Sequence, residues 1–96
     1  MQKIYAKIAG AFKYPDAKAP MKAMREGDGY QFVREPTNPY DPNAIALSVM
    51  NDGVPIRCGY VPARIAATLV NAEIESVVEG STWDEIIITI KEKTAA

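Results

Sequence analysis

Three prolines lie within seven residues, at positions 36, 39 and 42, in the segment 34–43, which reads REPTNPYDPN. Proline fixes its own φ angle, has no backbone N–H to donate, and restricts the preceding residue to extended conformations. No helix or interior strand passes through such a segment, and an ordinary connection does not need this stiffness. The segment is therefore predicted to be a rigid loop between two strands.

Tyr40 lies between two of these prolines, Pro39 and Pro42. An aromatic ring on a stiff frame loses little conformational entropy when it stacks on a flat ligand, and the carboxylate of Asp41 beside it accepts hydrogen bonds from a hydroxyl or an amine. A second interpretation is structural: Asn38 and Asp41 cap backbone N–H groups, and the Tyr40 ring packs over the mouth of the fold. Local chemistry alone leaves both interpretations open.

Short runs of alternating apolar residues predict strands on both sides of this loop. These runs span about residues 4–8, 30–35, 45–50, 55–61, 74–78 and 83–90. Asp52-Gly53 lies between the third and fourth runs, and Asp-Gly is typical of a hairpin turn because it accommodates positive φ angles. Gly80 and Ser81 are expected to turn between the last two strands.

Helical signals are fewer. Pro62 is expected to open a helix whose apolar stripe consists of residues 65, 66, 69 and 70 and which stops at Asn71. Residues 13–26 contain Pro15 and Pro20, so this segment is predicted to be a loop with at most one helical turn near residues 21–24. The expected fold is mainly β, an OB-like β-barrel of about six strands with one or two short helices, because closure removes exposed strand edges.

The composition of the chain restricts the classes of function that it can have. The chain of 96 residues has no histidine, which removes His-based triads and the commonest metal ligand. Cys58 is the single cysteine and is expected to be a core residue rather than a nucleophile. A metal site made by Glu35 and Asp41 is disfavoured because no third carboxylate clusters with them. We therefore expect no cofactor, no metal and no catalysis.

Residues 1–96 are expected to form one cytoplasmic domain, since no apolar stretch approaches the roughly 20 residues that span a bilayer and no signal sequence precedes the first strand. The formal net charge of −1 argues against a broad phosphate-binding surface. Residues 1–34, however, carry seven basic side chains against three acidic ones, a local net charge of +4 that can steer an anionic ligand to one side.

The segment 34–45, REPTNPYDPNAI, resembles the signature of the HIRAN domain family, and CGYVP at 58–62 resembles a second element of that family. The resemblance covers about residues 4–90. It implies an OB-like fold and capture of the 3′ end of single-stranded DNA. In that family the tyrosine of the NPYD element stacks on a terminal base and the aspartate hydrogen-bonds the 3′-hydroxyl. The resemblance assigns these roles to Tyr40 and Asp41, with Asn38 shaping the pocket.

Four further residues are expected to bind DNA. DNA-binding members of the family place an Arg-Tyr-Tyr cluster after the glycine that ends the first strand, whereas here Gly10 is followed by AFKY. Lys13 and Tyr14 are the candidates for a phosphate contact and a second aromatic surface. Tyr60 is expected to line the same pocket. Arg34 is the fourth candidate. Its side chain either clamps the backbone or is solvated.

The sequence thus predicts a non-catalytic module that recognises 3′ ends of single-stranded DNA in DNA repair or replication-fork processing. A DNA helicase, translocase or nuclease supplied in trans is the expected partner, and no membrane contact is expected. The alternative is a protein–protein interaction module whose groove takes a peptide or a partner's edge.

Overall fold

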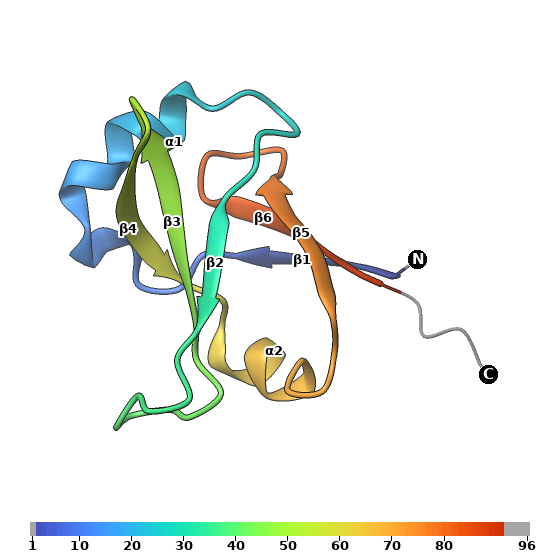
Figure 1. Cartoon of the computed structure of the whole chain (residues 1–96). Coiled ribbons are helices and arrows are strands. Elements are labelled where there is room, and N and C mark those ends of the chain that lie inside the picture. Colours follow the sequence, from blue (N-terminus) through green and yellow to red (C-terminus); the bar gives the residue numbers. More distant parts are fainter. Residues whose placement is uncertain (1, 92–96) are drawn as a thin grey trace.

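Six short strands and a few helical turns make up the fold in the computed structural model, which describes residues 2–91 (Figure 1). The strands are β1 (Gln2–Lys7), β2 (Gln31–Arg34), β3 (Ile45–Asn51), β4 (Val54–Tyr60), β5 (Ile74–Glu79) and β6 (Glu85–Ile90). The helical segments are the 3₁₀ turns η1 (Ala11–Lys13) and η2 (Pro15–Ala17) and the helices α1 (Lys18–Ala23) and α2 (Ala63–Thr68). The predicted mainly β class with short helices is confirmed.

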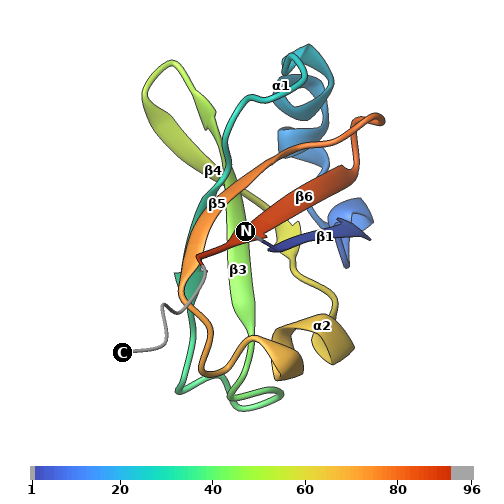
Figure 2. The same ribbon diagram turned by 90° about the vertical axis from the view of Figure 1, so that its right-hand side faces the viewer.

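The strands form two three-stranded antiparallel sheets, with the orders β1-β6-β5 and β2-β3-β4. Figure 2 shows the first sheet crossing the second. Isolated bridges join the sheets at two seams, Ala9 with Tyr60 and Gly29 with Val78. The path of the strands is therefore OB-like. Apart from these two bridges the two sheets are not paired with each other, so the described part of the chain is not one continuously hydrogen-bonded barrel.

The core lies between the two sheets. Ile45, Leu47 and Val49 of β3 point into it, as do Ile86 and Ile88 of β6, and all five side chains are buried. The predicted inward-facing residues of β3 are thus buried, and Ala46 between them is buried as well. Because each such burial contributes about 1.5–3 kcal/mol, the apolar faces of β3 and β6 hold the sheets together.

The hairpin between β3 and β4 has the predicted turn. Asp52 and Gly53 both have positive φ angles, 51° and 80°, as a two-residue primed turn requires. Further along β4 the register shifts, so that Leu47 pairs with Gly59 while the next residue of β3 pairs with Arg57. Cys58 is the extra residue of this bulge and is buried, as predicted, and burial raises the pKa of its thiol to about 11.

The segment 13–26 is more helical than predicted. Pro15 is the first residue of η2, and Pro20 is the third residue of α1. Both positions lie in a first turn, where a backbone N–H has no intrahelical partner, so the prolines do not interrupt a hydrogen bond. Ala17 and Met21 are buried against the core and anchor these turns.

Helix α2 ends earlier than predicted, at Thr68 instead of Asn71. The Leu69 N–H bonds to the Ala66 carbonyl at 3.0 Å, so the last turn tightens and the chain leaves the helix. Val70, assigned to the apolar stripe by its spacing, is consequently 48% exposed. No helix among residues 2–91 is long and apolar enough to cross a membrane.

Candidate nucleic-acid interface

The proline-rich loop joins β2 to β3 and projects from the lower end of their sheet in Figure 1. Its root is closed by the Glu35 N–H, which donates to the Ala44 carbonyl at 2.9 Å. Within the loop, the Asn38 N–H donates to the Glu35 carbonyl and the Ala44 N–H to the Asp41 carbonyl. The loop therefore has a defined backbone, as the three prolines predict.

Two side chains cap the backbone at the tip of the loop. Asn38 Oδ1 accepts hydrogen bonds from the N–H groups of Tyr40 (2.8 Å) and Asp41 (3.1 Å). Asp41 Oδ1 accepts one from the Asn43 N–H at 2.9 Å. The predicted capping is confirmed, and it occupies only one carboxylate oxygen: within the described chain Asp41 Oδ2 makes no hydrogen bond.

The Tyr40 side chain is 96% exposed. The interpretation in which its ring packs over the mouth of the fold is therefore wrong. Asn38 and the two flanking prolines fix the backbone on either side of the ring without covering it. The ring is available to a flat ligand, with a carboxylate oxygen one residue away.

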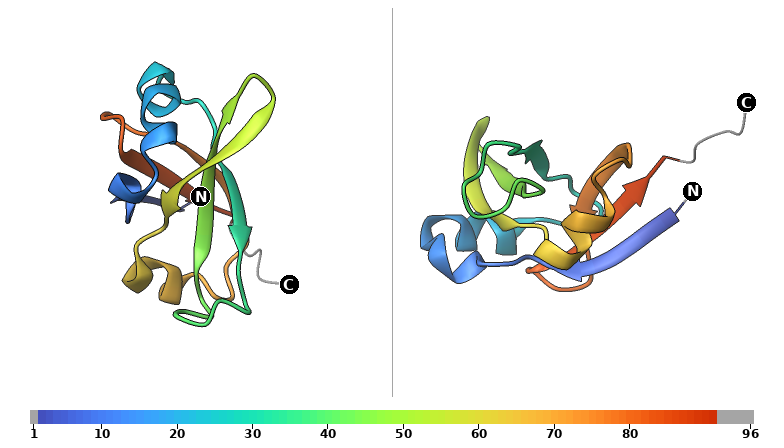
Figure 3. Two further views of the ribbon diagram at one scale, coloured as in Figure 1. Left: turned by 90° about the vertical axis from the view of Figure 1, so that its left-hand side faces the viewer. Right: turned by 90° about the horizontal axis from the view of Figure 1, so that it is seen from below.

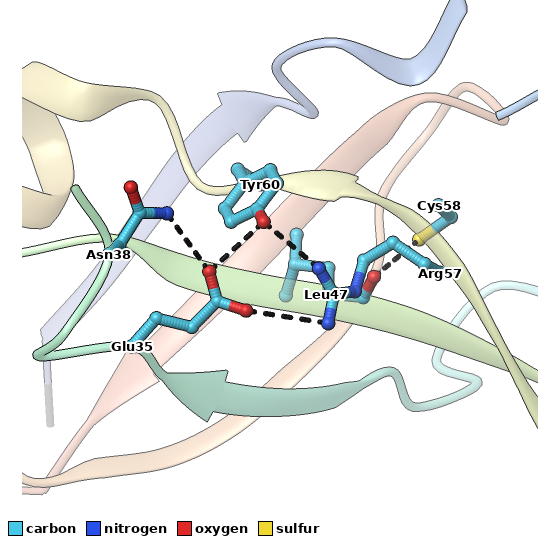
Figure 4. A network of polar contacts seen from close by, with 6 residues as sticks. All are labelled: Glu35, Asn38, Leu47, Arg57, Cys58 and Tyr60. Atoms are coloured by element: carbon cyan, nitrogen blue, oxygen red, sulfur yellow. Dashed lines mark hydrogen bonds and ion pairs between the residues drawn. The ribbon is translucent and has the colours of Figure 1, made fainter. Parts of the chain in front are cut away.

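A polar network ties this loop to β4 (Figure 4). Glu35 Oε1 accepts hydrogen bonds from the Asn38 side-chain amide (3.1 Å) and from the Tyr60 hydroxyl (3.0 Å). Arg57 donates to the Tyr60 hydroxyl at 2.9 Å and pairs with the other Glu35 oxygen at 3.4 Å. Glu35 is thus paired with Arg57, and the Tyr60 hydroxyl both donates and accepts a hydrogen bond within the protein.

The network also shifts the pKa values of Glu35 and Tyr60. The amide of Asn38 foremost, then Tyr60 and Arg57, lowers the pKa of Glu35 against the opposing effect of burial. Burial and the hydrogen bond to Glu35 raise the pKa of Tyr60. Because the pKa of Glu35 is lowered by folding, its stabilising contribution is complete above the pKa of an unfolded carboxyl and is lost as the pH falls through the lowered value.

The Arg34 side chain reaches the segment that follows α2. One guanidinium nitrogen, Nη2, donates to the carbonyls of Leu69 (2.8 Å) and Ala72 (2.7 Å), just beyond the C-terminus of α2. A cation is favourable at this end of a helix because unpaired carbonyls gather there. Arg34 is therefore a clamp on the protein's own backbone, and it joins β2 to the end of α2.

Removal of this clamp is expected to destabilise the fold. Arg34→Ala should lower the free energy of unfolding by about 1.5–3 kcal/mol, the range for hydrogen bonds made by a charged group. Urea denaturation followed by circular dichroism measures the change. Arg64→Ala, which removes an exposed arginine on α2, is the matched control and should cost less than about 0.5 kcal/mol. Equal free energies of unfolding for the two variants would show that the hydrogen bonds of Arg34 do not stabilise the fold.

Lys13 and Tyr14 follow Gly10, whose φ angle of 73° turns the chain into η1. Tyr14 is partly buried against the core, and the Lys13 ammonium lies 5.9 Å from the centre of the Phe12 ring. The bridge between Ala9 and Tyr60 holds η1 beside the end of β4. The turn that carries these residues thus lies beside the end of β4 that carries Tyr60, whereas Arg34 contacts the segment that follows α2.

Two residues of this region were missed by sequence reasoning. Arg57 orients Glu35 and Tyr60, but in the sequence it is one charged residue on an alternating strand. Phe12 is 84% exposed. Its position two residues after Gly10 and directly before Lys13 was the available signal. No group of three or more metal-binding side chains occurs among residues 2–91.

These features define a small OB-like β domain that presents an exposed aromatic ring on a stiffened loop, a class that binds ligands through loops and strand faces. The model of the HIRAN domain matches residues 2–84, so this chain belongs to the HIRAN domain family, a family of nucleic-acid-binding modules. The fold is similar to the crystal structure of the HIRAN domain of human HLTF, with a TM-score of 0.69 and 19% sequence identity over 92% of this chain and 74% of that chain. Comparison with curated proteins finds no match.

Proposed function

We propose that this domain is a non-catalytic module that recognises the 3′-terminal nucleotides of single-stranded DNA. The observation that carries the proposal is the Tyr40 ring, 96% exposed on a backbone fixed by Asn38. Stacking on an aromatic ring is sequence-tolerant because every base has a π face. Asp41 adds selectivity for an end, since its Oδ2 can accept a hydrogen bond from a terminal hydroxyl.

The other side chains take supporting roles. Asn38 holds the loop, and Glu35 holds Asn38. The rings of Tyr14 and Tyr60 offer a second aromatic surface, and Lys13 contacts a phosphate. A domain of this kind serves DNA repair or replication-fork processing by positioning a strand end for a helicase, translocase or nuclease in trans.

The energetics suit a nearly neutral protein. Two stacked bases at roughly 1–3 kcal/mol each and one hydrogen bond to a carboxylate at roughly 1.5–3 kcal/mol give about 4–9 kcal/mol before ordering costs. Micromolar binding requires about 8 kcal/mol. An end pocket therefore needs few phosphate contacts, which agrees with a net charge of −1.

A specific observation supports the alternative of a protein-interaction module. A hollow of about 190 Å³ lies on the Arg34 side of the loop, lined by Pro36, Pro42 and Val70 among others. Val33 of β2 is also exposed. If a partner's apolar segment binds there, substitutions of Tyr40 will leave its affinity unchanged.

The decisive test compares two oligonucleotides that differ only at the 3′ end. A 3′-phosphate removes the donor and brings negative charge to Asp41, so fluorescence anisotropy should show binding about tenfold to a hundredfold weaker than with a free 3′-hydroxyl. Asp41→Asn keeps an oxygen to cap Asn43 and should abolish most of this difference. A 5′-phosphorylated oligonucleotide is the control. Equal affinity for both 3′ ends would rule out end recognition.

A further inference from the structure

A second aromatic and basic surface lies away from the loop. A groove of about 580 Å³ runs between the helical turns that follow β1 and the turn that precedes β6. Phe12, Pro15, Lys18 and Trp83 line it. We refer to it as the Trp83 groove.

Lysine side chains lie over the aromatic rings of this groove. The ammonium groups of Lys18 and Lys22 are 5.7 and 5.6 Å from the centre of the Trp83 ring, and Lys13 lies in the same way over Phe12. The Phe12 ring is 84% exposed, and all three lysines are exposed. Aromatic rings beside cations are the arrangement by which proteins bind single strands, since the bases stack while the cations neutralise phosphates.

The charge balance of the groove favours an anion. Asp84 and Lys18 line the groove, and Asp16 belongs to η2, so two carboxylates stand against three lysines in these segments. The Asp84 carboxylate also accepts a hydrogen bond from the Thr82 hydroxyl at 3.0 Å. The groove is weakly cationic, which suits a ligand bound mainly by stacking.

The groove and the loop are linked through the end of β4. Ala9 and Tyr60 exchange two backbone hydrogen bonds, of 2.8 and 3.0 Å, which place η1 against the end of β4. The Tyr60 hydroxyl in turn bonds to Glu35 at the root of the loop. The loop projects from one end of the molecule, and the helical segments η2 and α1 lie toward the other end (Figure 1; Figure 3, left). A strand that occupies both sites therefore runs past Tyr60 and η1, which lie between them.

We propose that the Trp83 groove is a second binding site for single-stranded nucleic acid and takes nucleotides upstream of the 3′ end. The assignment of the groove as a binding site depends only on the residues that line it and on the lysines beside them. The direction of the bound strand, in contrast, rests on the proposed function of Tyr40 and Asp41. Phe12 and Trp83 stack on bases, and Lys13, Lys18 and Lys22 contact phosphates. A footprint longer than the terminal nucleotides follows, within the range of about 4–16 nucleotides known for OB folds.

Trp83 is the single tryptophan of the chain, so its fluorescence reports on the groove directly. An oligonucleotide of about twelve nucleotides, within that footprint range, should quench this fluorescence, whereas a dinucleotide bound at the loop should not. Phe12→Ala should weaken binding of the long oligonucleotide about fivefold to 150-fold, as expected for one stacked base, and leave the dinucleotide unaffected. Because Phe12 is exposed, the variant should fold normally.

The lysines are tested by salt dependence. The variant K18Q/K22Q should flatten the slope of log affinity against log salt by about 1.4, since each neutralised phosphate contributes about 0.7 for a single strand. K3Q/K7Q, which removes two exposed lysines of β1, is the matched control and should leave the slope unchanged.

Two results separate this proposal from end recognition. One result is binding that depends on the 3′-hydroxyl yet neither quenches Trp83 fluorescence nor responds to Phe12→Ala. That result would rule out the groove as a nucleic-acid site and leave end recognition intact. Quenching by an oligonucleotide with either 3′ end, at equal affinity, would support the groove and defeat end recognition. Quenching by peptides instead of oligonucleotides would also overturn the groove as a nucleic-acid site.

Discussion

Tyr40→Ala is expected to weaken binding of single-stranded DNA by about fivefold to 150-fold, the equivalent of the 1–3 kcal/mol that one stacked base contributes. The free energy of unfolding should not change, because the ring is 96% exposed and packs on nothing in the folded state. The loop should also keep its shape, since the Asn38 side chain bonds to the backbone N–H of residue 40, which any residue but proline retains. Loss of affinity without loss of stability is therefore the expected result.

Anisotropy with a short oligonucleotide labelled at its 5′ end measures this effect. Tyr40→Phe keeps the ring and should bind nearly as the parent does. Tyr5→Ala is the matched control, because Tyr5 is another exposed tyrosine, 63% accessible, on β1. If Tyr5→Ala and Tyr40→Ala lose affinity equally, the loop is not the stacking platform.

Gly59→Ala is expected to cost about 2–5 kcal/mol of folding free energy. A Cβ at this position would lie 2.4 Å from Ile8 Cγ2 and 2.7 Å from the Ala9 carbonyl oxygen, and the φ angle of 148° is one that side chains rarely adopt. Overpacking costs about 1–3 kcal/mol and an unfavourable φ about 1–2 kcal/mol. The contact lies at a seam between the sheets, next to the bridge between Ala9 and Tyr60.

A second glycine separates the two causes. Gly53 also has a positive φ angle, 80°, but a Cβ there would meet no atom within 4 Å. Gly53→Ala should therefore cost only the conformational part, about 1–2 kcal/mol. Urea denaturation of both variants gives the comparison. Equal losses would mean that the close approach of Gly59 to Ile8 and Ala9 does not limit stability.

Most local features were predictable because they depend on residues close together in the chain. The three prolines predict the rigid loop, the alternation in β3 predicts its buried face, and Asp52-Gly53 predicts the turn that follows. The motif around Tyr40 also predicts the family, which the match over residues 2–84 confirms.

Where prediction failed, a distant contact decided the outcome. Pro15 and Pro20 indicate a loop, yet burial of Ala17 and Met21 against the core stabilises helical turns in which both prolines are tolerated. Val70 has helical spacing, but α2 stops before it. The two interpretations of Arg34 could not be separated, since its partners are 35 and 38 residues away.

By itself the sequence determined the stiffness of the Tyr40 loop, the strand faces and the family, because φ restriction and side-chain alternation act over a few residues. Only the tertiary structure decided that the Tyr40 ring is exposed, that Arg57 and Glu35 lock the root of its loop, and that Lys18 and Lys22 lie over Trp83. These arrangements join residues from separate elements. They exist only after the apolar faces of the two sheets have packed and brought those elements together.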